Sequence, residues 1–228
     1  LLVTESAPKR KRGYYGAFAQ AGAPIGVILA NLALIITSAL VSEEFFNTWG
    51  WRIPFLASAL LIVISMYIQL NLEDTEAFKE LAAHRNEQEK DEQTVIEKSP
   101  VIEAIRKYPK RIVLAAGAFL NIQVTFYILI AFLLAYGVQS ANMERDDMLT
   151  AVLIASGIMV PVQFLFSSYS DRHGRRGIFM LGAVLSGLWA FGGVPLVDPG
   201  NFWLRVLAVS GGLVFLAMMY GPQAAFFT

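Results

Sequence analysis

Six stretches of predominantly apolar residues, each about as long as a membrane-spanning helix, follow one another along this sequence. An α-helix rises about 1.5 Å per residue, so about 20 apolar residues cross the roughly 30 Å hydrocarbon layer of a bilayer. The stretches occupy residues 16–41, 53–72, 112–138, 148–169, 177–197 and 204–227. The pattern predicts an all-α, polytopic membrane protein with six transmembrane helices in view.

The polar segments between these stretches differ sharply in their content of lysine and arginine. Segments 4–13, 73–111 and 170–176 contain 15 of the 18 Lys and Arg residues, whereas the alternate segments contain only Arg52, Arg145 and Arg205. Loops rich in Lys and Arg stay on the cytoplasmic side of a membrane. We therefore expect these three segments to face the cytoplasm of a multi-pass plasma-membrane protein, with a bacterial cytoplasmic membrane as its expected location.

The charged segment 73–111 divides the chain. It contains ten acidic and eight basic residues. Within it, residues 73–92 are expected to form a solvated helix with charge pairs three or four residues apart, and residues 100–107 a short surface helix. The expected domains are the end of an N-terminal helical bundle at 1–72, a cytoplasmic linker at 73–111 and the start of a C-terminal helical bundle at 112–228.

Composition supports a membrane protein and argues against enzyme chemistry. The 228-residue chain is 56% hydrophobic and 16% charged, whereas an average soluble domain is about 25% charged. It has no cysteine, and its two histidines, His84 and His173, fall in polar segments. The sequence has no acid pair at membrane depth, no nucleophile with a base and no glycine-rich phosphate loop. We therefore expect no enzyme, no metal site and no cofactor.

Four consecutive cations, Lys9 to Arg12, precede the first apolar stretch. Such a run is also typical of nuclear-localisation and nucleic-acid-binding segments. Because it directly adjoins a membrane span, we interpret it as a cytoplasmic loop at the surface of a lipid bilayer. We expect the bilayer as a partner and no nucleic acid.

A few strongly polar side chains lie inside the apolar stretches, where lipid would leave them without hydrogen-bond partners. We expect five of them to face a substrate cavity near the middle of the membrane, between helices. They are Asn31, Asn121, Gln123, Tyr127 and Gln163. The alternative for each is a hydrogen bond to a neighbouring helix, worth about 0.6 kcal/mol on average.

The segment Ser170-Asp171-Arg172-His173-Gly174-Arg175-Arg176 separates the fourth and fifth stretches. An acid and three arginines between two membrane-length apolar runs predict a short turn at the membrane surface. The pattern Asp171-Arg172-x-Gly174-Arg175-Arg176 resembles the signature loop of the major facilitator superfamily of transporters. Ser167 stands where that loop has its first glycine.

Further motifs resemble, more narrowly, the metabolite:proton symporter family of that superfamily. They are Glu5-Ser6-Ala7-Pro8 with Arg12-Gly13, Gln20-x-Gly22-x-Pro24-x-Gly26, Gly50-Trp51-Arg52-Ile53-Pro54-Phe55 and Tyr220-Gly221-Pro222-Gln223. The linker departs from the family pattern, because Asp74-Thr75 is followed by Glu76 where the family usually has a proline. The resemblance covers nearly the whole chain except this linker.

The resemblance implies a twelve-span protein with two six-helix halves, in which this chain would run from the end of span four to span ten. It also implies secondary active transport, a proton-coupled uptake of a small polar metabolite, an organic acid or a zwitterion, by alternating access. The partners would be that substrate, protons and the bilayer. No span has an ionisable residue at mid-depth, so the coupling acid is expected in spans outside this chain. The residues alone leave open a membrane channel, a helical membrane scaffold or, less favoured, a membrane-embedded enzyme.

In the superfamily, the signature loop of one half is expected to latch onto a helix end in the other half. The candidate partner here is the helix start at Gly13 to Ala17, whose unpaired N–H groups would stabilise the Asp171 carboxylate by about 0.3–1 kcal/mol. The other members expected of this conformational latch are Arg172, Gly174, Arg175 and Arg176, with Glu5 as an anionic partner of the arginines. At the outer boundary, Arg52 is expected to snorkel to the interface, to form an outer-gate ion pair or to attract anionic substrates.

Overall fold

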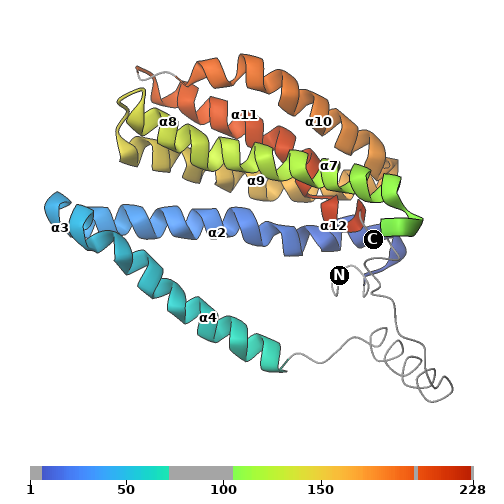
Figure 1. Cartoon of the computed structure of the whole chain (residues 1–228), viewed down its shortest axis with the longest axis horizontal. Helices are drawn as coiled ribbons and strands as arrows, with labels where there is room; N and C mark the ends of the chain where they lie inside the picture. The colour runs from blue at the N-terminus through green and yellow to red at the C-terminus, as the bar shows by residue number, and fades with distance from the viewer. Residues whose placement is uncertain (1–6, 72–104, 198–199, 227–228) are drawn as a thin grey trace.

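Every regular element is a helix in the computed structural model, across the residues that it describes, which are 7–71, 105–197 and 200–226 (Figure 1). Five helical segments are long and apolar enough to cross a membrane: Arg12–Leu40, Gly50–Asn71, Pro109–Gln139, Arg145–His173 and Phe202–Phe226. They coincide with five of the six predicted spans. The all-α membrane architecture expected from the hydropathy pattern is thus confirmed.

The remaining predicted span, 177–197, contains a shorter helix than expected. This helix is α10 (Arg175–Gly192), which has 18 residues, begins with two arginines and is followed by the 3-10 turn η4 (Val194–Leu196). The Trp189 ring lies so close to Gly193 that a Cβ atom there would collide with it. Its Nε1 donates to the carbonyl of Ala208 on the neighbouring helix at 2.9 Å. The end of α10 is thus packed around this indole ring.

The two longest helices, α2 (Arg12–Leu40) and α9 (Arg145–His173), have 29 residues each and pack side by side (Figure 1). They run in opposite directions, because the start of α2 meets the end of α9. Small buried residues of α2, among them Gly13, Gly16 and Ala17, allow the two backbones to approach closely. Since α2 falls in the predicted N-terminal bundle and α9 in the C-terminal one, this pair joins the two predicted bundles.

The C-terminal elements share one apolar core. α7 (Pro109–Tyr127), the π-helical segment η3 (Ile128–Phe132) and α8 (Leu133–Gln139) follow one another in line and pack with α9 and α11 (Phe202–Tyr220). The core includes Ile122, Leu129, Leu133, Val152, Met159, Leu213, Leu216 and Met219. The π-helical segment places Leu129 against Gly212 of α11, where a Cβ atom would lie 2.6 Å from Leu129 Cδ2.

Helix α4 (Ile53–Asn71) has a different environment. It follows two short elements beyond the end of α2, namely α3 (Glu43–Thr48) and η2 (Gly50–Arg52), and it diverges from α2 toward its own C-terminus (Figure 1). None of its residues is buried in the part of the chain that the structure describes. The domain division at 1–72, 73–111 and 112–228 stays a prediction. The predicted linker helix at 73–92 lies outside the described residues, and of the one at 100–107 only 105–107 are described, as helix.

The charged motif at 170–176 is not the multi-residue turn that the sequence predicts. Helix α9 continues through Asp171 to His173 and α10 begins at Arg175, so Gly174 alone connects them. Gly174 has a φ of 92°, in the left-handed region that favours glycine. Because the helix continues, Asp171 has a fixed direction on the surface of α9 rather than the freedom of a loop.

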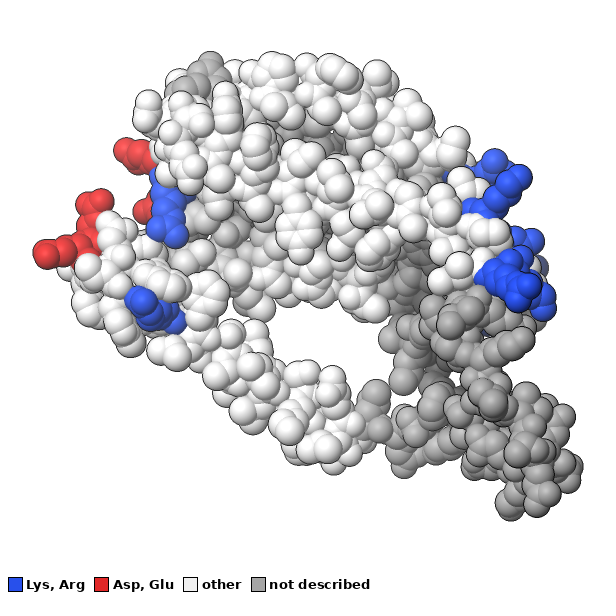
Figure 2. Space-filling view, in the orientation of Figure 1, with Lys and Arg blue, Asp and Glu red and all other residues white. Residues whose placement is uncertain are grey.

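Charged side chains gather at the two ends of the helices (Figure 2). Lysines and arginines cover the end at which α2 begins and α9 stops. Acidic side chains, with a few arginines, lie at the opposite end, near α3. This distribution agrees with the orientation predicted from the loop charges.

Candidate functional site

The Asp171 carboxylate lies at the start of α2. Its Oδ1 accepts a hydrogen bond from the backbone N–H of Gly13 at 2.9 Å, and its Oδ2 accepts one from the N–H of Tyr14 at 2.9 Å. The side chain of Asp171 is only 4% exposed. Gly13 permits this approach, since a Cβ atom there would lie 2.7 Å from Asp171 Oδ1 and 3.0 Å from the carbonyl oxygen of Ser167. The contact expected at this helix start is therefore present, and its role as a latch stays a prediction.

Arg175 connects the same carboxylate to the end of the chain. Its Nη2 lies 3.5 Å from Asp171 Oδ1, and its Nη1 donates to the carbonyl of Ala225 in α12 (Gln223–Phe226). Arg172 and Arg176 are exposed and form no ion pair among the described residues. Glu5, the expected partner of these arginines, lies outside the described residues. Of the three arginines, Arg175 is thus the one that contacts Asp171.

A second layer of polar contacts lies further along α2. Gln20 Nε2 donates to Gln223 Oε1 at 3.1 Å, which links α2 to α12. Gln163 of α9 is fully buried, and its Nε2 lies 3.4 Å from the carbonyl oxygen of Ala17. Together with Asp171 these contacts tie α2 to both α9 and α12. Sequence reasoning placed Gln163 in the cavity and did not pair Gln20 with Gln223.

The departure at Ser167 is accommodated by a glycine on the opposing segment. Ser167 is fully buried, and a Cβ atom on Gly221 would collide with its Oγ and lie 2.6 Å from the carbonyl oxygen of Gln163. Gly221 and Pro222 separate α11 from α12, so the last predicted span is two helices rather than one. Close approach of α9 and the α11–α12 junction at Ser167 thus depends on the absence of a side chain at Gly221.

The five predicted cavity residues do not converge on one pocket. Asn31 and Gln163 are buried, with 7% and 0% exposure. Asn121 is exposed on α7, with its Nδ2 3.4 Å from the sulfur of Met219. Gln123 and Tyr127 line a shallow, largely apolar depression of about 580 Å³ on the surface of α7 and η3. Their joint role as a substrate cavity stays a prediction.

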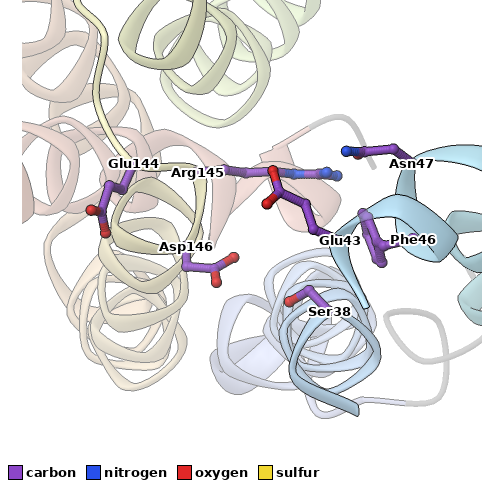
Figure 3. Close-up of a pocket in the computed structure, with 7 residues that line it drawn as sticks. All are labelled: Ser38, Glu43, Phe46, Asn47, Glu144, Arg145 and Asp146. Atoms are coloured by element: carbon purple, nitrogen blue, oxygen red, sulfur yellow. The ribbon is translucent and has the colours of Figure 1, made fainter. Parts of the chain in front are cut away.

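The opposite end of the α2–α9 pair contains a polar pocket of about 370 Å³ (Figure 3). Its lining comes from the end of α2, from α3 and from the start of α9: Ser38, Glu43, Phe46, Asn47, Glu144, Arg145 and Asp146. The guanidinium carbon of Arg145 lies 5.0 Å from the centroid of the Phe46 ring. Sequence reasoning missed Arg145, which it treated only as one of three cations on the outer side.

Arg52, the predicted outer-gate residue, contacts only neighbouring residues of its own segment among those described. Its Nη1 donates to the carbonyl of Thr48 at 2.8 Å, and its guanidinium lies 4.2 Å from the centroid of the Trp51 ring. It forms no ion pair within the described residues. These contacts fit the interfacial alternative, and the outer-gate assignment stays a prediction.

A partly buried ion pair at the outer side was also missed. Arg205 Nη2 lies 2.6 Å from Asp147 Oδ2, with side-chain exposures of 5% and 44%. Each residue lies in the first turn of its helix, Asp147 on α9 and Arg205 on α11. Sequence gives the charges and their depth, but the pairing requires knowledge that α9 and α11 are neighbours.

The arrangement is suited to binding and conformational coupling. In the described residues, no group of three or more His, Asp or Glu side chains is placed to hold a metal ion. The polar contacts join helices from the two predicted bundles at one end, and a pocket separates the same helices at the other. Such a pair of ends can respond to a ligand by shifting between alternative packings.

Comparison with known proteins adds relatives to this description. A sequence model of the Major Facilitator Superfamily matches residues 1–228. The chain is 32% identical to the inner membrane metabolite transport protein YhjE of Escherichia coli strain K12, over 99% of this chain and 50% of that protein. It is 30% identical to the shikimate transporter of the same strain, over 100% of this chain and 51% of that protein.

A third relative is the proline/betaine transporter of Escherichia coli strain K12, which is 29% identical over 96% of this chain and 43% of that protein. The chain thus spans about half the length of the relatives that it matches. No solved structure matches it.

Proposed function

Because this chain belongs to the Major Facilitator Superfamily, we propose that it works within a secondary active transporter that takes up a small polar metabolite by alternating access. The chain is part of a multi-pass protein of a bacterial inner membrane and not of an enzyme. The relatives are named for metabolites, shikimate, and proline and betaine. We extend to this protein the class that these names share, an organic acid or a zwitterion, and propose that a proton gradient drives its uptake.

The observation that carries this proposal is the pair of hydrogen bonds from Gly13 and Tyr14 to Asp171. They join α2 to α9 across the boundary between the two predicted bundles. A carboxylate at a helix start accepts from N–H groups that have no partner within the helix and meets the positive end of the helix dipole. Hydrogen bonds to a charged group are worth about 1.5–3 kcal/mol each. The contact therefore opposes separation of the bundles at the cytoplasmic end.

Two further contacts support the same role. Arg175 bridges the Asp171 carboxylate and the Ala225 carbonyl, so a movement of α12 is transmitted to the latch. Gln20 and Gln223 form a second link between α2 and α12 deeper in the bundle. Opening of the cytoplasmic side would break the contacts of Asp171 and Gln223 with α2, whereas the Arg175 bridge lies within the predicted C-terminal bundle. A channel or a static scaffold has no need of polar contacts that must break and re-form.

The test is uptake by the intact protein in proteoliposomes. We expect saturable accumulation of L-proline, glycine betaine or shikimate when an inward proton gradient is imposed, and its collapse when a protonophore is added. Accumulation that survives the protonophore would overturn proton coupling. A flux that does not saturate with solute concentration would favour the channel, and the absence of any flux would favour the scaffold.

A further inference from the structure

The outer pocket is built from both predicted bundles. Ser38 of α2 and Glu43, Phe46 and Asn47 of α3 contribute one wall, while Glu144 and the first two residues of α9 contribute the other (Figure 3). Its volume of about 370 Å³ lies at the small end of ligand pockets, which span about 300–1,000 Å³. A small metabolite bound there would touch both bundles at once.

Arg145 is the only cation among the residues that line this pocket. It is the first residue of α9, where the positive end of the helix dipole disfavours a cation. Its guanidinium lies over Phe46, a ring that is only 5% exposed, and among the described residues it forms no ion pair. This holds although Glu43, Glu144 and Asp146 line the same pocket. The planar donors of Arg145 are thus available to a ligand.

The charges of the lining restrict what such a ligand can be. Three carboxylates and one guanidinium line the pocket, so its lining carries an excess of negative charge. A ligand with only negative charge would be repelled, whereas a ligand with only positive charge would leave Arg145 unused. A molecule with one carboxylate and one cationic nitrogen satisfies both signs. Its carboxylate can accept the paired N–H donors of a guanidinium, and its nitrogen can approach the acids.

We propose that this pocket is an outer binding site for a small zwitterion, in which Arg145 binds the carboxylate and Glu43, Glu144 and Asp146 surround the cationic nitrogen. One part of the proposal rests on the proposed transport function: it takes the site to lie on the path by which the substrate is taken up. Arg145 contacts the Phe46 ring across the pocket. When a carboxylate binds, Arg145 exchanges the ring for the ligand and the contact between α9 and α3 changes.

The test measures occupancy of the pocket independently of transport. This chain has no cysteine, so Ser38→Cys places one thiol of this chain in the pocket wall. The rate at which a membrane-impermeant maleimide labels it is measured in the intact protein, with L-proline or glycine betaine as zwitterions and shikimate as an anion. The measurement is repeated with Arg145→Gln, Arg145→Lys and Glu44→Gln. Glu44 is the matched acid control, because it neighbours Glu43 without lining the pocket.

We expect a zwitterion to slow the labelling and shikimate to leave it unchanged. Arg145→Gln should raise the protecting concentration at least about tenfold, the loss expected for a charge-assisted pair of hydrogen bonds. Arg145→Lys should give an intermediate value, because lysine keeps the charge and loses the planar fork. Glu44→Gln should change nothing.

The proposal is overturned if neither zwitterion protects the thiol, if shikimate protects it equally, or if protection survives in Arg145→Gln. Uptake measured on the same proteoliposomes separates the two failures. Uptake without protection overturns the outer site and leaves the transporter. Protection without uptake keeps the site and overturns the proposed transport function.

Discussion

The two ends of the α2–α9 pair differ although the same two helices form both. At the cytoplasmic end, Gly13 lies against the Asp171 carboxylate, and a Cβ atom in its place would be 2.7 Å from Oδ1. At the outer end, large side chains such as Phe46 and Arg145 surround a pocket of about 370 Å³. Small residues allow the close approach at the inner end, whereas larger side chains line the pocket at the outer end.

The two ends also differ in how firmly they are held. The cytoplasmic end has two hydrogen bonds to a charged group, worth about 1.5–3 kcal/mol each. The outer end has the contact of Arg145 with Phe46, and an exposed cation–π pair is worth about 0.5–1 kcal/mol. A small ligand can therefore replace the outer contact far more easily than the inner one. This difference agrees with the proposals that the inner end is a latch and that the outer end binds the ligand first.

The largest expected effect comes from filling the space at Gly13. A side chain in Gly13→Val must displace Asp171 and presses on the carbonyl of Ser167, at 3.0 Å from the position of Cβ. Overpacking typically costs about 1–3 kcal/mol, and the two hydrogen bonds of Asp171 are lost as well. We expect initial uptake in proteoliposomes to fall by well over about tenfold. The control is Gly22→Val, because a Cβ atom there meets nothing within 4 Å. Equal loss in both variants would contradict the importance of this end.

A smaller effect is expected from Asp171→Asn, which keeps the shape of the side chain. The amide has one acceptor oxygen, so its NH₂ group would face one of the two N–H donors of Gly13 and Tyr14. We expect a loss of about 1.5–3 kcal/mol from the closed cytoplasmic end. Initial uptake should slow while the amount of protein in the membrane stays near that of the parent. Glu44→Gln, an exposed acid at the outer end, serves as the control. Unchanged uptake by Asp171→Asn would contradict the proposal that Asp171 acts as a latch.

The fold and the inner end were predicted for different reasons. Hydropathy reports the depth of each residue in the membrane, whereas the contact of Asp171 with the start of α2 was expected from the resemblance of residues 171–176 to the superfamily's signature loop. The extension of α9 to His173 was not visible, because it depends on Gly174 alone turning the chain. Nor could the sequence show that Gly221 lies against Ser167.

The outer end could not be predicted, because depth does not determine which helices are neighbours. Arg52 and Arg145 are both isolated cations in outer segments, and only Arg52 was predicted to have a role there. Packing separates them, since Arg52 turns to Thr48 and Trp51 of its own segment while Arg145 reaches Phe46 on α3. The pair of Asp147 and Arg205 likewise appears only once α9 and α11 are known to be adjacent.

A third variant, Asp147→Asn, tests whether stability within the C-terminal bundle is separate from the contacts between bundles. It leaves the buried Arg205 guanidinium facing a neutral amide. Breaking a fully buried pair costs about 3–5 kcal/mol, but Asp147 is 44% exposed, so water compensates and we expect about 1–2 kcal/mol. The melting temperature of the purified protein should fall. Maleimide labelling at Ser38→Cys should stay unchanged, and an altered labelling rate would show that the pair also sets the outer end.

The smallest expected effect concerns the link between Gln20 and Gln223, 3.1 Å apart between Nε2 and Oε1. Hydrogen bonds between membrane helices average about 0.6 kcal/mol, which corresponds to about a threefold shift in the balance between closed and open cytoplasmic ends. Gln20→Leu should therefore slow uptake by no more than about threefold, far less than Asp171→Asn. Because Gln223 is buried at 5% exposure, Gln20→Leu leaves its amide without this partner. The double variant Gln20→Leu/Gln223→Leu removes both groups and should transport faster than Gln20→Leu alone. Together with the single variant Gln223→Leu, these proteins form a double-mutant cycle. If the losses of uptake in the two single variants add up to the loss in the double variant, the two glutamines act separately and their contact does not hold the inner end closed.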